Sequence, residues 1–332
     1  MKLKLRKLQL ARRATQLSVI ALILLIPAMA RYANYLSARE LDKKLERWDG
    51  SLQGKTLAAI DWGLRQLPDG ETERAGAMVR NRTKVLTYAQ QLRGGVWSLE
   101  LPGVSMTDPL AAAESFAAAK RIPLVLLISL IIPILITVVF GRVFCSWLCP
   151  MNLLLEFNDK LRAVLRFLEL KPRNQRFSRW TKYAMLATGL ALAAVLSIPV
   201  LGYIYAPAII GRELHEFTFG LFDHAEQGRL GFWLGGLTLM SLVIVAIAVF
   251  ELTISRRWWC RYLCPGGALY SLLGWARLVR VRRAGDKCVK CHQCVDVCQV
   301  GLVPMRDRTG HECDNCGLCI SHCSSGALGY SL

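Results

Sequence analysis

The chain has 332 residues, of which 53% are apolar and 20% charged, and 42 Lys and Arg against 24 Asp and Glu give a formal net charge of +18. A mean hydropathy of +0.33 excludes an ordinary soluble protein, because the apolar residues gather in long uncharged runs. A basic balance can mark a nucleic-acid-binding protein. Here the positive charge clusters in particular segments between the runs, which is typical of membrane topology, so no nucleic-acid partner is expected.

Four runs contain no Asp, Glu, Lys or Arg, and they cover residues 14–30, 122–140, 183–211 and 230–250. A helix needs about 20 apolar residues to cross a hydrocarbon layer about 30 Å thick, so each run predicts a transmembrane helix. The first run follows a basic stretch, as the core of a signal peptide would. No clear cleavage site follows it, which favours an uncleaved anchor.

The charges between the runs predict the orientation. Six basic and no acidic residues precede the first run, nine against three lie in 142–182, and seven against none lie in 256–283. In contrast, 31–121 carries fourteen basic and eleven acidic residues, and 212–229 carries two against four. Because basic loops stay in the cytoplasm, we expect a multi-pass protein of the bacterial cytoplasmic (inner) membrane with both termini cytoplasmic.

The exported segment between the first two runs is expected to be helical. Apolar residues spaced by three and four in 41–48 and 78–92 predict two helices there. The mixed charges of 31–93 are typical of a solvated surface, so this segment is interpreted as a cap or docking surface without a catalytic site.

Two R-x2-C-x3-C-P motifs follow the second and fourth runs and contain Cys145 with Cys149, and Cys260 with Cys264. Each motif precedes an amphipathic stretch, 153–170 or 268–283, that is expected to form a helix in the membrane interface. Cysteines four apart share one face of a helix, so two such helix ends would present four thiols to one point. Packing cysteines are the simpler alternative. The recurrence of the motif favours a redox or metal-binding role and leaves the metal open.

The other eight cysteines form two C-x2-C-x2-C-x3-C motifs in the last 47 residues, 286–332. All twelve cysteines lie on the predicted cytoplasmic side, where thiols stay reduced, so metal binding is expected rather than disulfides. The two motifs resemble the bacterial two-cluster ferredoxin, in which the fourth cysteine of each motif ligates the other cluster. That resemblance implies two [4Fe-4S] clusters, the first held by Cys288, Cys291, Cys294 and Cys323 and the second by Cys313, Cys316, Cys319 and Cys298.

The proline that usually follows the fourth cysteine is replaced by Gln299 in one motif and by Ser324 in the other. This departure concerns the local turn rather than the ligands. A pair of zinc sites is the disfavoured alternative, because zinc sites typically use separated C-x2-C pairs.

No histidine falls inside an apolar run and the exported part contains no C-x-x-C-H motif, so no haem is expected. Electrons that reach cytoplasmic clusters then need a mobile carrier, and a membrane quinone is the obvious one. A quinone requires an apolar pocket with polar groups that take its protons. Glu251 at the cytoplasmic end of the fourth run is the favoured candidate, and Asp108 and His215 near the outer ends of the runs are the others.

Four spans, two C-x3-C-P motifs and a two-cluster tail together resemble the NapH/MauN group of membrane ferredoxins, which is related to NosR-type proteins. The TDPLA sequence at residues 107–111 is similar to a stretch at the same place in that group. The resemblance implies an all-α membrane protein with four transmembrane helices, two interfacial amphipathic helices and a small C-terminal α+β ferredoxin-like domain. The expected divisions are an N-terminus with the first helix (1–30), an extracytoplasmic segment (31–121), the remaining spans (122–285) and the ferredoxin domain (286–332).

The resemblance implies electron transfer between the quinol pool and a redox partner, which is expected to be an iron–sulfur or cytochrome subunit. The chain would then be a quinol dehydrogenase subunit acting within a complex. The alternative is a maturation protein that supplies electrons for metal-centre or cofactor assembly in another enzyme. Scattered methionines and an exported segment without cysteine disfavour copper handling, and the lack of paired intramembrane charges disfavours a transporter.

Overall fold

The computed structural model describes residues 2–66, 99–101, 104–120, 123–169, 172–223, 239–307 and 309–332. The chain forms two compact units. The first comprises Met1–Val19, Met106–Ile210 and Val243–Leu332, and the second comprises Ile20–Ser105 and Gly211–Leu242.

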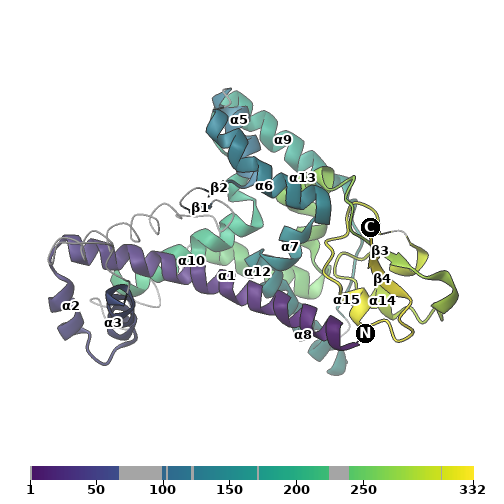
Figure 1. Ribbon diagram of the computed structural model, residues 1–332, viewed down its shortest axis with the longest axis horizontal. Coiled ribbons are helices and arrows are strands. Elements are labelled where there is room, and N and C mark those ends of the chain that lie inside the picture. The colour runs from purple at the N-terminus through teal and green to yellow at the C-terminus, as the bar shows by residue number, and fades with distance from the viewer. Residues whose placement is uncertain are drawn as a thin grey trace. The chain divides into compact units, whose positions relative to one another are not determined.

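The first unit is built mainly from helices (Figure 1). They are α5 (Pro109–Ala119), α6 (Leu124–Phe140), α7 (Val143–Trp147), α8 (Pro150–Phe167), α9 (Trp180–Leu196), the 3-10 turn η1 (Leu201–Tyr203), the π-helix η3 (Trp259–Leu263) and α13 (Pro265–Leu273). Helix α9 packs against both α5 and α13, which brings segments far apart in the sequence side by side. Three more helices have residues in both units, namely α1 (Lys2–Ser37), α10 (Ala206–Asp223) and α12 (Leu239–Thr253).

One helix within the described ranges is long and apolar enough to cross a membrane, the 31 residues Lys7–Ser37 of α1. The apolar helices α6, α9 and α12 coincide with the other three predicted spans but have 17, 17 and 15 residues. A 17-residue helix is about 26 Å long, slightly less than the hydrocarbon layer. Four transmembrane helices therefore stay a prediction.

The predicted span 183–211 is not one helix. Helix α9 ends at Leu196, because Ser197 adopts a left-handed conformation with φ of 54° and Pro199 follows two residues later. The search for uncharged runs did not account for these helix-stop signals. Of the predicted span 230–250, the structure describes the part from Leu239 onward.

The two predicted amphipathic helices differ in outcome. The first forms α8, whereas the second, expected over 268–283, ends as α13 at Leu273. Residues Arg280–Arg283 instead form strand β3, which pairs antiparallel with β4 (Leu328–Ser331). The helical interpretation of these residues is wrong because Val281, between exposed arginines, is buried by the strand pairing.

The C-terminal tail is a small α+β fold. The β3–β4 pair and the short helices α14 (Gln293–Asp296) and α15 (Leu318–Ser321) enclose a core that includes the cysteines themselves. Two 3-10 turns, η4 (Gly285–Lys287) and η5 (Pro304–Arg306), complete it. The apolar core of the tail is small and includes Val281, Ile320 and Leu328. A core of this size provides limited stability by itself.

The second unit contains α2 (Leu41–Arg47) and α3 (Leu52–Arg65), and the strands β1 (Leu99–Leu101) and β2 (Val104–Met106) form a two-stranded sheet. Ser51 caps α3 by accepting a hydrogen bond from Gly54 N at 3.1 Å. Tyr32, Trp48 and Leu57 are buried in one apolar core. A helix is present in the predicted range 41–48, and the predicted helix 78–92 lies outside the described residues.

Candidate functional site

Each C-x3-C-P motif turns the chain from one short helix into the next. Cys145 lies in α7 and Cys149 caps the start of α8, while Cys260 lies in η3 and Cys264 caps α13. Proline has no backbone N–H and disfavours a helical conformation at the residue before it. Both capping cysteines are accordingly extended, with ψ of 119° and 116°. The two cysteines of a motif therefore do not lie on one continuous helix, which corrects the sequence interpretation.

The thiols of the two motifs are nevertheless neighbours. Burial raises the pKa of Cys149, and the nearby Cys145 and Cys264 raise it further. Burial also raises the pKa of Cys260, with contributions from Cys264 and Cys149. Among the residues that the structure describes, no three His, Cys, Asp or Glu side chains are close enough to hold a metal ion. A metal at these four cysteines thus stays a prediction.

The arginine that precedes each cysteine pair is buried in an ion pair. Arg142 Nη1 lies 2.7 Å from Glu312 Oε2, and Arg257 Nε lies 2.9 Å from Asp159 Oδ2. A buried charge is costly unless it is paired. The ion pairs therefore fix the backbone from which the cysteines project.

The pKa values of the tail thiols depend on neighbouring thiols, although no three of the described side chains form a metal-binding group there. Burial raises the pKa of Cys294, and the neighbouring Cys291 and Cys323 contribute in the same direction. The pKa of Cys319 is raised by burial and then by Cys313 and Cys298. Cys294 of the other implied set also raises the pKa of Cys319, so these influences do not separate the two ligand sets. Thiolates are the donors that iron–sulfur clusters require. The assignment of each cysteine to a cluster stays a prediction.

Glu312, directly before Cys313, joins the tail to the helices of the first unit. Its Oε2 accepts from Arg142 at 2.7 Å and from Lys182, and its Oε1 accepts from the hydroxyl of Tyr183. Burial alone would raise the pKa of Glu312, but the positive charges of Arg142 and Lys182 lower it to about 2. This carboxylate is therefore ionised at any physiological pH.

A second polar contact involves the residue after Cys298, which is predicted to ligate the same cluster as Cys313. Gln299, directly after Cys298, is buried and donates from Nε2 to Glu156 Oε1 at 3.1 Å. Glu156 lies on α8 and also accepts from Arg12 Nη1 at 2.6 Å. Sequence reasoning missed both contacts, although the replacement of the usual proline by Gln299 was a visible signal. Two cysteines predicted for the second cluster, Cys298 and Cys313, are thus each adjacent to a residue that bonds to the chain near a C-x3-C-P motif. These residues are Gln299 and Glu312.

Asp108, one of the predicted quinone residues, is buried and accepts hydrogen bonds from backbone and tyrosine groups. It caps α5 by accepting from Leu110 N at 2.8 Å, and its side chain is 4% exposed. The hydroxyl of Tyr270 on α13 lies 3.5 Å from Asp108 Oδ1, and Tyr205 also hydrogen-bonds to this carboxyl group. No sequence pattern indicated these tyrosines, because their partner is distant in the chain.

The contact between Asp108 and Tyr270 bears on the predicted topology. Sequence reasoning placed Asp108 on the outer side and Tyr270 on the cytoplasmic side. A hydrogen bond cannot join the two faces of a layer about 30 Å thick. The loop before α5 must therefore enter the layer if both assignments hold, and Thr107 Oγ1 indeed lies 2.7 Å from Ser129 Oγ within α6.

The other two predicted residues have contacts of their own. Glu251 is buried and its Oε1 accepts the backbone N–H of Trp259 at 2.9 Å, directly before Cys260. His215 belongs to the second unit, where its ring stacks on Phe219 with centroids 4.6 Å apart. The three residues do not form one site within the first unit.

The cysteine motifs, their helical supports and the α+β tail define a ferredoxin-type iron–sulfur protein that transfers electrons. A family model described as a 4Fe-4S binding domain matches residues 122–167 and 236–284. The chain is 32% identical to the ferredoxin-type protein NapH of Haemophilus influenzae over 216 residues, 61% of this chain and 67% of the relative. It is 31% identical to the methylamine utilization ferredoxin-type protein MauN of Methylorubrum extorquens over 210 residues, 62% and 65% of the two chains. The chain belongs to the NapH/MauN family of ferredoxin-type proteins, which confirms the predicted resemblance.

The aligned regions cover about two thirds of the length of these curated relatives. No solved structure matches the chain.

Proposed function

We propose that this protein is a multi-pass membrane subunit that oxidises quinol and passes the electrons to a redox partner. The observation that carries the proposal is the buried Asp108 with its two tyrosines, which share the first unit with the C-x3-C-P motifs and the anchored tail. Two [4Fe-4S] clusters, held by the eight cysteines of the tail, would supply one-electron carriers. Membership of the NapH/MauN family supports electron transport as the outcome.

The surfaces of the apolar helices support four membrane spans. Large apolar side chains are exposed along them, including Leu124 and Val125 on α6, Val195 on α9 and Leu239 on α12. A contiguous apolar surface of this kind is unfavourable in water and suits contact with lipid chains. Helices of 15 to 17 residues can be accommodated by local thinning of the bilayer.

The chemistry of quinol assigns a role to Asp108. Oxidation of a quinol releases two electrons and two protons, so the site needs a proton acceptor beside the electron acceptor. A carboxylate held among Tyr205, Tyr270 and an apolar helix can accept a quinol proton, and the tyrosine hydroxyls can orient the ring by hydrogen bonds. The favoured place for quinol is therefore Asp108 rather than His215, with Glu251 as the second candidate.

The tail cysteines differ in exposure, and this difference supports a particular docking surface for the redox partner. Cys313, Cys316 and Cys319 are buried, whereas Cys291 is exposed and Val289 beside it is 67% exposed. Electron transfer requires close approach, so a partner would approach the set that contains Cys291.

We expect about eight irons and eight sulfides per chain in anaerobically purified protein, since two complete [4Fe-4S] clusters need eight of each. Low-temperature EPR of the reduced protein should show two interacting clusters. About four irons, or zinc in their place, would contradict the ligand prediction for the tail.

Asp108→Asn should slow quinol-driven reduction of the iron–sulfur absorbance at least a hundredfold, because loss of a positioned proton acceptor typically has effects of this size. Asparagine still caps a helix well, so α5 is expected to stay folded. Reduction by dithionite and the iron content should be unchanged.

His215→Ala is the control and should keep the wild-type rate, because the proposed site consists of Asp108 and its two tyrosines, while the His215 ring stacks on Phe219. A wild-type rate in Asp108→Asn together with a slow Glu251→Gln protein would move the quinol site to the end of α12.

A further inference from the structure

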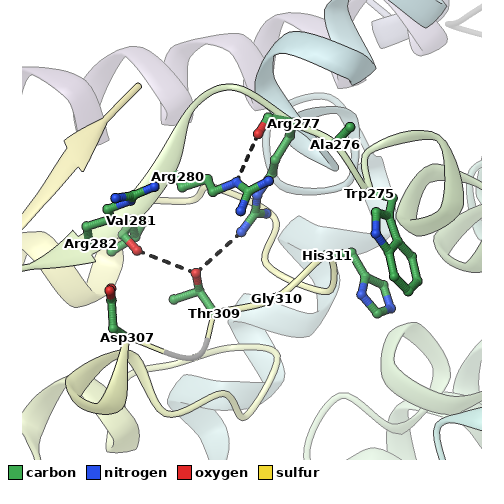
Figure 2. Close-up of a pocket in the computed structure, with 10 residues that line it drawn as sticks. All are labelled: Trp275, Ala276, Arg277, Arg280, Val281, Arg282, Asp307, Thr309, Gly310 and His311. Carbon is green, nitrogen blue, oxygen red and sulfur yellow. Dashed lines mark hydrogen bonds between the residues drawn. The ribbon is translucent and has the colours of Figure 1, made fainter.

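A basic cavity of about 520 Å³ lies in the first unit, next to the tail (Figure 2). Arg277 follows α13, Arg280 and Arg282 lie on β3, and Thr309 faces them from the loop that leads to Cys313. Figure 2 shows Arg277 between Arg280 and Arg282 on one side and Trp275 and His311 on the other, and the stacked rings of Trp275 and His311 have centroids 4.7 Å apart. The cavity belongs to none of the groups invoked above for quinol or iron.

The charges in this cavity are strongly unbalanced. Three guanidinium groups face one carboxylate, that of Asp307, whose Oδ1 already accepts the backbone N–H of Arg283 at 3.3 Å. Arg280 uses its Nε to donate to the carbonyl of Arg277 at 3.0 Å, and within the described residues no hydrogen bond engages its terminal nitrogens. In the portion of the chain that is described, no hydrogen bond or ion pair engages the guanidinium of Arg282. Several donors are therefore available to an anion.

Arg277 gives the cavity a fixed floor. Its side chain is 2% exposed, donates from Nη1 to the carbonyl of Cys313 at 2.5 Å and lies 3.4 Å from Thr309 Oγ1. A side chain added at Gly141 would meet Arg277 Cδ at 2.7 Å, so glycine at this position makes room for the arginine. The floor is thus positively charged and built from both the helical part and the tail.

The segment between the lining residues Arg277 and Arg280 is bonded to the end of an apolar helix. The backbone N–H groups of Leu278 and Val279 donate to the carbonyl of Val139 in the last turn of α6. Trp275 lines the cavity and is 66% exposed, and two apolar side chains close to it in sequence, Leu272 (47%) and Leu278 (55%), are exposed as well. Tryptophan with apolar neighbours beside arginines is the composition of a membrane–water interface.

We propose that this cavity binds the phosphate of an anionic phospholipid headgroup, with the lipid chains lying along Leu272, Trp275 and Leu278. Guanidinium groups bind phosphate oxygens in pairs, and basic pockets on the cytoplasmic side of membrane proteins bind anionic headgroups. The cavity is within the usual size of a small-ligand site. The proposal rests on the membrane insertion in the proposed function, and it adds a lipid that tightens the contact of the tail through Arg277.

The test is lipid retention by the intact holoprotein in a neutral detergent, measured by native mass spectrometry with phosphatidylglycerol or phosphatidylcholine added. Wild-type protein should retain phosphatidylglycerol in preference to phosphatidylcholine and unfold at a higher temperature with it. The Arg280→Gln/Arg282→Gln protein should bind phosphatidylglycerol about tenfold more weakly or worse, since each bond to a charged group contributes about a factor of ten.

The matched control is Arg176→Gln/Arg306→Gln, which removes the same charge from exposed positions outside the cavity and should bind as wild type. Equal retention of both lipids, or equal loss in both double variants, would overturn the proposal. Equal stabilisation by inorganic phosphate would also overturn it, because the ligand would then be a free anion. Membrane fractionation and iron content of the same samples report separately on the proposed function.

Discussion

Glu312→Ala is expected to lower the thermal unfolding midpoint of the tail substantially and to release iron at a lower temperature than in the wild type. The substitution leaves Arg142 and Lys182 buried without their carboxylate partner. Breaking a buried ion pair costs about 3–5 kcal/mol, because the remaining charge stays desolvated. The loss of iron–sulfur absorbance during a thermal scan in detergent measures this directly.

Asp286→Ala is the matched control, since it removes an exposed acid from the same tail. Glu312→Gln should fall between the two, because it can still accept the hydrogen bond of Tyr183 but carries no charge. Midpoints for Glu312→Ala and Asp286→Ala that agree within error would show that the ion pairs do not hold the tail.

Much of the local structure could be predicted because it depends on short-range signals. The apolar runs gave α6, α9 and α12, and the proline after each C-x3-C marked the start of α8 and α13. The failures came where local signals compete. Ser197 stops α9 inside an uncharged run, and pairing with β4 makes a strand of residues with helix-compatible spacing.

The contacts of the candidate site could not be predicted in the same way. Asp108 meets Tyr270 across 162 positions of sequence, and Arg142 meets Glu312 across 170. Periodicity describes one element at a time, so it cannot report which buried acid faces which tyrosine or arginine. Gln299 departs visibly from the ferredoxin pattern, but the sequence analysis related this departure to the local turn and did not predict its bond to Glu156.

Gln299→Pro should weaken the attachment of the tail although it restores the residue typical of ferredoxins at this place. The substitution removes the Nε2 donor to Glu156 at 3.1 Å in a buried setting. A hydrogen bond to a charged group contributes about 1.5–3 kcal/mol. We therefore expect a lower unfolding midpoint and faster hydrogen exchange in the segment around Cys298, with iron bound before heating.

Ser324→Pro provides the matched control for this comparison. It makes the same change after the fourth cysteine of the other motif, where the side chain is exposed. Exposed substitutions usually change stability by less than about 0.5 kcal/mol. A drop for Gln299→Pro with none for Ser324→Pro would assign the effect to the contact with Glu156. Equal drops in both proteins would instead assign it to the ring of proline in the cysteine turn, and α8 would then have no specific role in holding the tail.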